Sequence, residues 1–342
     1  MEPVTAARNA LEYVLEALPG EKIAIFCDDG KRDIGNAFAS GAIDLGLWTR
    51  MITLHPKADE IRKKLPDVVY QAILSDKPDI CVNLLRQKME EAPFRLDLVN
   101  VETRNKRMRL GHCPDITIDM LTEGALALTK EEHGELQKNA KLLIDQLTDA
   151  VEIEITTSEG TGLIFSVEGR EFLTDTYIDW KKMNWLNLPT GEVFTVPIAS
   201  TFEGLLVCDV AAQGIGKISQ EIHIQVKEGK VSSLTCKDKE IEKKVKRALT
   251  YDKMASIVSE FAFGLNTKAR IVPQFLETEK IANTVHIGFG HNLDFPGGTN
   301  SSINHIDFII DKPTVTVSFA DERLETLMAD GEIELQSLYE EI

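Results

Sequence analysis

The chain has 342 residues, with 38 basic and 55 acidic side chains, and its formal charge at pH 7 is −17. Hydrophobic residues make up 43% of it, too many for a disordered chain, and no apolar run approaches the roughly 18 residues of a membrane span. So acidic a protein is not expected to coat nucleic acid, which takes a basic face. We predict a soluble protein of two domains that binds neither nucleic acid nor membranes.

The N-terminus and the cysteines indicate a cytoplasmic protein. Met1–Val4 and the residues after them lack the basic stretch, apolar core and cleavage site of a signal peptide. The five cysteines are far apart, odd in number and never spaced C-x-x-C: Cys27, Cys81, Cys113, Cys208 and Cys236. This excludes a dense disulfide framework and a thiolate zinc site, and it predicts reduced, mostly buried thiols.

The first quarter of the chain alternates between helical and strand patterns. Helical spacing of apolar residues occurs at 5–18, 37–45 and 57–75, and β-rich runs occur at 22–27, 50–54 and 79–85. Strands separated by helices of this length predict βαβ units and a parallel sheet.

The loop after the first predicted strand does not carry a nucleotide-binding motif. Residues 27–35 match neither G-x-G-x-x-G nor a P-loop, and Asp28 and Asp29 would repel a pyrophosphate. We interpret this loop as a place of packing and partner contacts.

The concentrated positive charge of the chain lies at Arg104, Lys106, Arg107 and Arg109. Two interpretations remain open, a solvated helix face and a clamp for an anionic ligand or carboxylate.

The pattern changes near residue 150. An amphipathic helix is predicted at 130–149, and strictly alternating runs follow at 151–157 and 163–167, with another pair at 221–226 and 230–235. One or two helices are expected around 240–265. We therefore predict an N-terminal α/β domain with a parallel sheet (1–150) and a mixed α+β, antiparallel-rich, metal-binding domain (151–342).

Two histidines and an aspartate in the second half suggest a metal site. His305 and Asp307 form H-x-D on a predicted strand, where residues i and i+2 share a face and can chelate one ion. His286 lies in a β-branched run whose neighbours face the other way. A Gly-rich turn at 295–300 joins the two runs, so their side chains can converge. We interpret His291, which lies between them, as a loop residue in the first instance.

Two glutamates are candidates for further ligands. Glu192 lies at a turn-to-strand junction, and Glu260 is flanked by apolar residues. A carboxylate in such surroundings must be exposed, paired or metal-bound, because burying it bare is costly. One carboxylate with two histidines suits a mononuclear metal, and further carboxylates suit a dinuclear hydrolytic centre.

Four blocks of sequence in order resemble the aminopeptidase T family of dinuclear metallo-aminopeptidases. They are Leu188–Pro197 (LPTGEVFTVP), Glu260–Asn266 (EFAFGLN) with Ala269–Ile271, Thr284–Gly290 (TVHIGFG), and Gly297–Asn300 (GGTN) followed by His305–Asp307 (HID). The resemblance covers roughly residues 100–320.

The resemblance implies a ligand set and a chemistry. Glu192, Glu260, His286, His305 and Asp307 match the family's metal ligands. Two divalent ions (zinc, cobalt or magnesium) would polarise the scissile carbonyl and deliver a bound hydroxide to a peptide substrate, with one glutamate bridging the ions or taking the proton from water. We assign the catalytic role to Glu260. A homodimer is also implied.

The sequence departs from the family at one catalytic position. The family places a tyrosine shortly after the first histidine, where it donates a hydrogen bond to the developing oxyanion. Residues 287–304 contain no tyrosine, and Leu293 and Phe295 lie in that stretch. His291 is our candidate for the missing catalytic donor.

This departure leaves two alternatives open. The family is similar in fold to iron-dependent ring-cleaving dioxygenases of dihydroxypyridines. In this first alternative, His286, His305 and Asp307 of this chain would hold a single Fe(II). The second alternative is a catalytically inactive relative that serves as a binding module.

Overall fold

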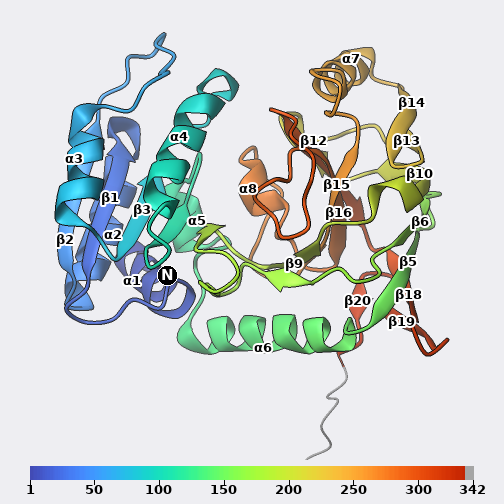
Figure 1. The fold of residues 1–342 in the computed structure, drawn as a ribbon, viewed down its shortest axis with the longest axis horizontal. Coiled ribbons are helices and arrows are strands. Elements are labelled where there is room, and N and C mark those ends of the chain that lie inside the picture. Colours follow the sequence, from blue (N-terminus) through green and yellow to red (C-terminus); the bar gives the residue numbers. More distant parts are fainter. Residues whose placement is uncertain (336–342) are drawn as a thin grey trace, which may run out of the picture. The chain divides into compact units, whose positions relative to one another are not determined.

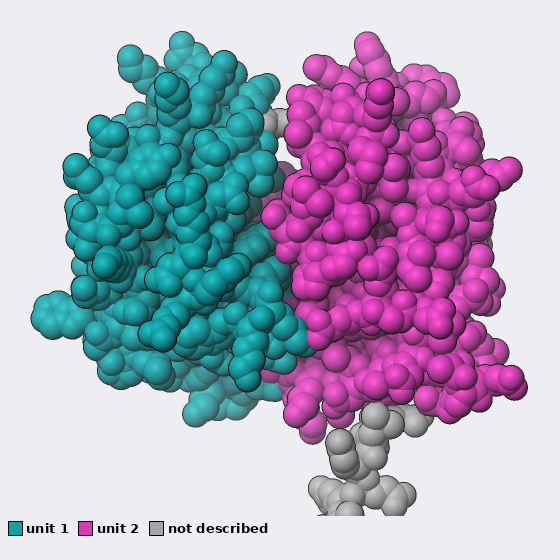
Figure 2. Space-filling view, viewed as in Figure 1, with its two compact units in different colours: residues 1–135, 175–190 teal, residues 136–174, 191–342 magenta. Residues whose placement is uncertain are grey.

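The structure is a computed structural model that describes residues 1–335, apart from the side chain of Met89. Residues 336–342, the end of the predicted second domain, lie outside the described residues. The chain forms two compact units, residues 1–135 with 175–190 and residues 136–174 with 191–342 (Figure 2). This division differs from the predicted single boundary at residue 150, because the segment 175–190 adds a strand to the sheet of the first unit.

The first unit is built on a parallel sheet of five strands in the order β2-β1-β3-β4-β8 (Figure 1). The strands are β1 (Lys22–Asp28), β2 (Trp48–Leu54), β3 (Ile80–Leu84), β4 (Arg109–His112) and β8 (Trp185–Asn187). All four strand pairs are parallel. The predicted parallel α/β architecture is confirmed, and β4 and β8 are the strands that the sequence pattern did not reveal.

Helices cover both faces of this sheet because successive residues of a buried strand point to opposite sides. The unit contains α1 (Pro3–Asn9), a π-helical turn (Ala10–Val14), α2 (Arg32–Asp44), α3 (Asp67–Asp76), α4 (Ala92–Thr103) and α5 (Ile118–Thr122). Ile23 and Ile25 pack with residues of α1, α2 and α5, whereas Ala24 and Phe26 pack with residues of α3 and α4.

The loop after β1 is closed by buried ion pairs. Arg62 donates to both oxygens of Asp28 at 2.6 and 2.9 Å and to Glu91 at 2.7 Å, and Glu91 also binds Arg86. This supports the interpretation of the loop as a packing element. The helix predicted at 57–75 is wrong in its first part, since only Asp67–Asp76 is helical. Arg62, in the non-helical part, forms the ion pairs with Asp28 and Glu91 instead.

The basic cluster is neither a single helix face nor a single clamp. Arg104, Lys106 and Arg107 are exposed after α4, but Arg109 is buried on β4. Its guanidinium donates to the carbonyl oxygens of Leu15 and Glu16 at 3.0 and 2.6 Å. Arg109 therefore ties the N-terminal helical segment to the sheet.

Glu102 on α4 gives the first unit a pH-dependent stability. Its carboxyl is fully buried and accepts a hydrogen bond from Asn83 Nδ2 at 2.7 Å. Burial raises the pKa of Glu102 from 4.5 to about 8. Because the folded state holds this proton more tightly than the unfolded chain, its contribution to stability is full below about pH 4.5 and is lost as the pH rises through 8.

We expect Glu102→Gln, which mimics the protonated acid, to remove this dependence. Between roughly pH 5 and pH 8 the free energy of unfolding of the wild type should fall as the pH rises, and that of the variant should not. The difference between the two should therefore grow by up to about 1.4 kcal/mol per pH unit. Urea unfolding of both proteins across this range measures the difference. A difference that stays constant with pH would contradict the assignment.

The second unit consists of two mainly antiparallel sheets (Figure 1). The first has the order β14-β13-β10-β6-β5-β18-β19-β20, with β5 (Ala150–Thr156), β6 (Gly162–Ser166), β10 (Glu203–Cys208), β13 (Ile222–Lys227), β14 (Lys230–Cys236), β18 (Thr314–Phe319), β19 (Leu324–Ala329) and β20 (Glu332–Ile333). The second has the order β12-β11-β17-β16-β15-β9-β7, with β7 (Leu173–Thr174), β9 (Glu192–Thr195), β11 (Ala211–Ala212), β12 (Gly216–Lys217), β15 (Val258–Gly264), β16 (Thr284–Gly290) and β17 (His305–Asp311). Both predicted hairpins are present, as β5–β6 and β13–β14.

One hydrophobic core joins the two sheets. It includes Ile153 and Phe165 from the first sheet and Phe261, Ile287 and Phe308 from the second. The sheets therefore pack face to face, with the core side chains of both between them. The antiparallel-rich second domain that the sequence predicted is confirmed.

The helices of the second unit are few. α7 (Lys239–Leu249) and α8 (Phe275–Thr278) belong to it, and so do residues 136–146 of α6 (Lys130–Gln146). The prediction of one or two helices around 240–265 is met by one helix, α7, and Val258–Gly264 in the same stretch is a fully buried strand. No helix within the described residues has the length and apolar character needed to cross a membrane.

All five cysteines are free and buried. Burial raises the pKa of the Cys27 thiol to about 11, so this thiol stays protonated at neutral pH. The buried thiols match the prediction from their spacing.

Candidate metal centre

Four neighbouring strands of the second sheet place acidic and histidine side chains on one face. Val193, Phe261, Ile287 and Phe308 point into the core between the sheets. Because side chains alternate along a strand, their neighbours point to the opposite face. The residues on that face are Glu192 on β9, Glu260 on β15, His286 on β16, and His305 and Asp307 on β17.

The register of the strands brings these residues together. Glu260 lies opposite Gly288, and Gly288 lies opposite Asp307, so the three form one row across β15, β16 and β17. His286 lies one step along, opposite Ala262. The prediction that the His286 strand and the His305-x-Asp307 strand converge is therefore met by two adjacent, directly paired strands.

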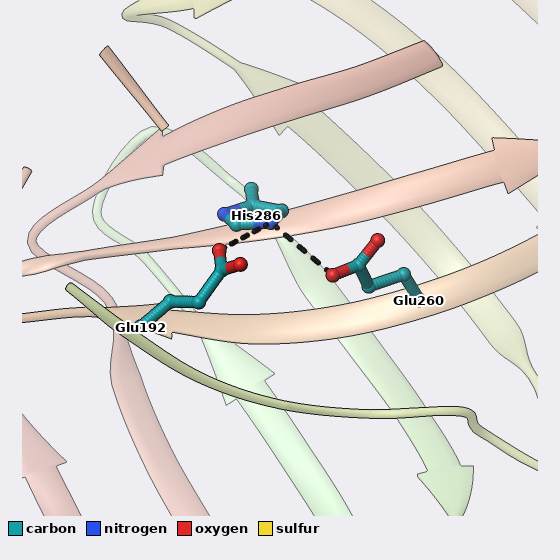
Figure 3. Close-up of side chains that lie close together, drawn as sticks. All are labelled: Glu192, Glu260 and His286. Carbon is teal, nitrogen blue, oxygen red and sulfur yellow. Dashed lines mark ion pairs between the residues drawn. The ribbon is translucent and has the colours of Figure 1, made fainter. Parts of the chain in front are cut away.

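The five side chains form two groups of three that share one member. Glu192, Glu260 and His286 each offer a ligand atom within 4.8 Å of the others, and so do Glu260, His305 and Asp307. In the first group both carboxylates point toward the imidazole of His286 (Figure 3). The separations from His286 Nε2 are 3.6 Å to Glu192 Oε2 and 3.8 Å to Glu260 Oε1.

Glu260 belongs to both groups through different oxygens. Its Oε1 faces His286, and its Oε2 lies 3.3 Å from His305 Nε2. His305 Nε2 in turn lies 2.9 Å from Asp307 Oδ1. A carboxylate that directs one oxygen to each of two ligand groups has the geometry of a bridging ligand.

The backbone fixes the orientation of His305. Its Nδ1 lies 2.8 Å from the carbonyl oxygen of His291, and a carbonyl can only accept, so Nδ1 carries the proton. The other nitrogen, Nε2, faces Glu260 and Asp307, and it offers a lone pair on that side once its proton is displaced. This is the tautomer that a metal ligand needs.

The charges of the cluster shift its pKa values strongly. Burial alone would raise the pKa of Glu260, but hydrogen bonds with His286 and His305 outweigh it and hold the pKa below its ordinary value. Burial would likewise lower the pKa of His286, but Glu260 and the charge of Glu192 raise it to about 9. Without a metal the cluster therefore holds protons on its histidines, and metal binding must displace them.

A glycine allows the candidate ligands to lie close to the strand between them. A Cβ atom on Gly288 would lie 2.6 Å from Asp307 Oδ1, 2.9 Å from Glu260 Cβ and 3.1 Å from His305 Cε1. Any larger residue would fill the space that these groups surround. Together with a donor set of two imidazoles and three carboxylates, this fits a centre for divalent metal ions.

Two residues beside the cluster were not predicted from the sequence. Lys280 is fully buried, and its Nζ lies 2.5 Å from Glu192 Oε1 and 2.9 Å from Glu279 Oε1. Glu279 is also buried. They follow the short helix α8, and no spacing or periodicity in the sequence links them to Glu192.

His291 lies outside both ligand groups of the described residues. Its Nδ1 is 2.8 Å from the carbonyl oxygen of Ser302, and its Nε2 is 3.1 Å from Asp294 Oδ2. The hydrogen bond with Asp294 raises the pKa of His291. Both ring nitrogens thus have partners in its own loop, and the catalytic donor role of His291 stays a prediction.

The Gly-rich turn of the fourth sequence block has a structural role. Asn292 Oδ1 accepts from the backbone N–H groups of Thr299 and Asn300, and Asn292 Nδ2 donates to the carbonyl oxygen of Ser259. The loop is therefore tied to the residue that precedes Glu260. These bonds hold the strand that carries the shared carboxylate.

The sequence profile of the thermophilic metalloprotease family M29 matches residues 122–333. The chain belongs to this family. The match covers all five candidate ligands and confirms the resemblance seen in the four sequence blocks. Membership in the M29 family makes the protein a metal-dependent hydrolase and implies a divalent metal cofactor and a peptide substrate. No curated protein sequence matches the chain.

Two solved structures share the whole fold of this M29 protein. AmpT from Thermus thermophilus is 18% identical, with a TM-score of 0.70 over 97% of this chain and 98% of that one. The 2,5-dihydroxypyridine dioxygenase from Pseudomonas putida KT2440 is 13% identical, with a TM-score of 0.72 over 98% of this chain and 97% of that one. At these identities the likeness concerns the fold alone.

Proposed function

We propose that the protein is a metallo-aminopeptidase with a dinuclear centre, which removes N-terminal amino acids from peptides. The observation that carries this proposal is the carboxylate of Glu260, whose two oxygens face two different groups of ligands. In this proposal Glu192 and His286 would hold one ion, His305 and Asp307 would hold the other, and Glu260 would contribute to both positions.

Different residues of the chain have different roles in the proposed reaction. Bound divalent ions would supply Lewis-acid activation of the scissile carbonyl and of a water molecule. Glu260 would supply one carboxylate oxygen to each of the two positions. The carbonyl oxygen of His291 keeps His305 in the tautomer that binds through Nε2. Gly288 keeps the space between Glu260 and Asp307 open.

The arrangement argues against the iron dioxygenase alternative. That chemistry needs two histidines and one carboxylate around a single ion. Among the described residues, His286 and His305 fall into different groups, and Glu260 belongs to both. The fold likeness to the dihydroxypyridine dioxygenase does not by itself transfer its reaction.

Substrate assays on the metal-loaded protein test the proposal. We expect hydrolysis of leucyl and other aminoacyl p-nitroanilides and of short peptides, and no hydrolysis of the same peptides after N-acetylation. Hydrolysis that is indifferent to N-acetylation would contradict an aminopeptidase. Oxygen consumption with 2,5-dihydroxypyridine, in protein loaded with Fe(II), would favour the alternative.

Other parts of the prediction have less support. The identity of the metal (zinc, cobalt or magnesium) and the homodimer rest on the resemblance alone, and the cytoplasmic location rests on the number and spacing of the cysteines. We retain them as part of the proposal.

A further inference from the structure

A buried lysine contacts the candidate centre through Glu192. Of the described lysines, only Lys280 is buried, with no exposed surface. Its ammonium lies between two carboxylates, 2.5 Å from Glu192 Oε1 and 2.9 Å from Glu279 Oε1. A buried ammonium is costly unless it is paired, so this arrangement calls for an explanation.

The backbone around Lys280 is fixed by the loops that carry the ligands. The carbonyl oxygen of Lys280 accepts from the N–H of Asn266 at 2.8 Å, and the N–H of Leu265 donates to the carbonyl oxygen of Gly191 at 2.8 Å. A Cβ on Gly191, whose φ is +140°, would lie 2.5 Å from Asn266 Cβ. The residue before Glu192, the loop after β15 and Lys280 thus form one closely packed corner.

The two carboxylate oxygens of Glu192 face different partners. Oε1 is bound by the ammonium, and Oε2 lies on the side of His286 Nε2, 3.6 Å away. Rotation of the carboxylate is therefore opposed by an ion pair in a buried environment, where such pairs are screened little. One oxygen is held in place to serve as a ligand.

We propose that Lys280 is a positioning residue that holds Glu192 as a one-oxygen ligand and thereby sets the metal affinity of the Glu192–Glu260–His286 group. This inference rests on the proposed dinuclear function. Lys280 has no exposed surface with which to touch a substrate, so it acts through Glu192. Within the described residues, the ion pairs of Glu260, His305 and Asp307 are with one another and with His286, and none is with a lysine or arginine.

Removal of the ammonium has a selective consequence. In Lys280→Met, Glu192 loses the partner of Oε1 and faces the carboxylate of Glu279 with no cation between them. Like charges repel, so Glu192 should leave its position. Loss of a contact that orients a ligand typically lowers metal affinity about 10- to 100-fold. The effect should fall on one of the two ions only.

Calorimetric titration of the metal-free protein with Zn²⁺ tests this inference. Wild type should show two binding events per chain. In K280M one of them should weaken about 10- to 100-fold while the other is unchanged. The exposed Lys253 provides a matched control, because Lys253→Met makes the same change of charge and should leave both events unchanged.

A double variant keeps the test independent of folding. Glu279→Gln combined with K280M removes the carboxylate that K280M leaves without its cation, and thermal unfolding shows whether each protein folds. The same selective weakening is expected, since Glu192 Oε1 still lacks the ammonium of Lys280. Two unchanged events, or equal weakening of both, would overturn the role of Lys280.

The outcomes separate this inference from the proposed function. Wild type that binds two zinc ions but cleaves no peptide would contradict the aminopeptidase and not the role of Lys280. If wild type binds a single ion, the dinuclear proposal fails. An unchanged affinity for that ion in K280M would then overturn the role of Lys280 as well.

Discussion

Glu260→Gln is expected to remove both metal ions and to lower peptide hydrolysis by at least about 1,000-fold while the fold survives. Glu260 is the one residue common to the two ligand groups, and its oxygens face His286 and His305 separately. An amide presents a single neutral oxygen, so it cannot supply an anionic ligand to two positions. Loss of a transition-state contact on this scale corresponds to roughly 4 kcal/mol of barrier.

The measurement for Glu260→Gln combines metal content by elemental analysis with the hydrolysis rate of an aminoacyl p-nitroanilide. Glu240→Gln is the matched control, because Glu240 is an exposed glutamate on α7. The control should keep metal and activity. Far-ultraviolet circular dichroism should match wild type for both variants. A Glu260→Gln protein that retains two ions and full activity would show that the centre is misplaced.

Gly288→Ala should disrupt the centre by adding one methyl group. The new Cβ would meet Asp307 Oδ1 at 2.6 Å and Glu260 Cβ at 2.9 Å. Real Cβ atoms are not found so close to other heavy atoms, so the ligands must shift. The backbone of Gly288 lies in a regular strand with no left-handed φ, so alanine itself is tolerated there.

We expect Gly288→Ala to lower metal affinity on the order of 100-fold and activity with it. Gly162→Ala is the control, because Gly162 also lies in a strand and its added Cβ would meet no heavy atom within 4 Å. Zinc titration and the hydrolysis rate measure both variants. Equal metal affinity in Gly288→Ala and wild type would mean that the space beside Gly288 is not where the ions bind.

The sequence pattern was sufficient to predict that His305 and Asp307 share a face and that His286 faces away from its apolar neighbours. Alternation on the strand of His305 and Asp307 places both on one side, and the apolar neighbours of His286 fix its orientation in the same way. The parallel sheet of the first unit followed from regular alternation of strands and helices. In these segments the local period and the burial of side chains agree.

Other features of the fold and of the candidate site depend on contacts between segments that are distant in the sequence, and local patterns do not predict them. Glu260 lies in a strand that is buried throughout, and an apolar run of this length does not distinguish a buried strand from a helix. Lys280 and Gly288 acquire their places only through the register of neighbouring strands and loops. Arg62 lies within the predicted helix 57–75, but in the structure it is not helical and forms ion pairs with Asp28 and Glu91. No local pattern in the sequence reveals these contacts.

The stoichiometry of metal binding tests the central claim most directly. The wild-type protein, stripped of metal and titrated with Zn²⁺, is predicted to bind two ions per chain, and elemental analysis after removal of free metal should give the same number. His305→Ala should weaken one of the two. A single ion per chain in the wild-type protein, or none, would contradict the dinuclear centre that Glu260 is proposed to bridge.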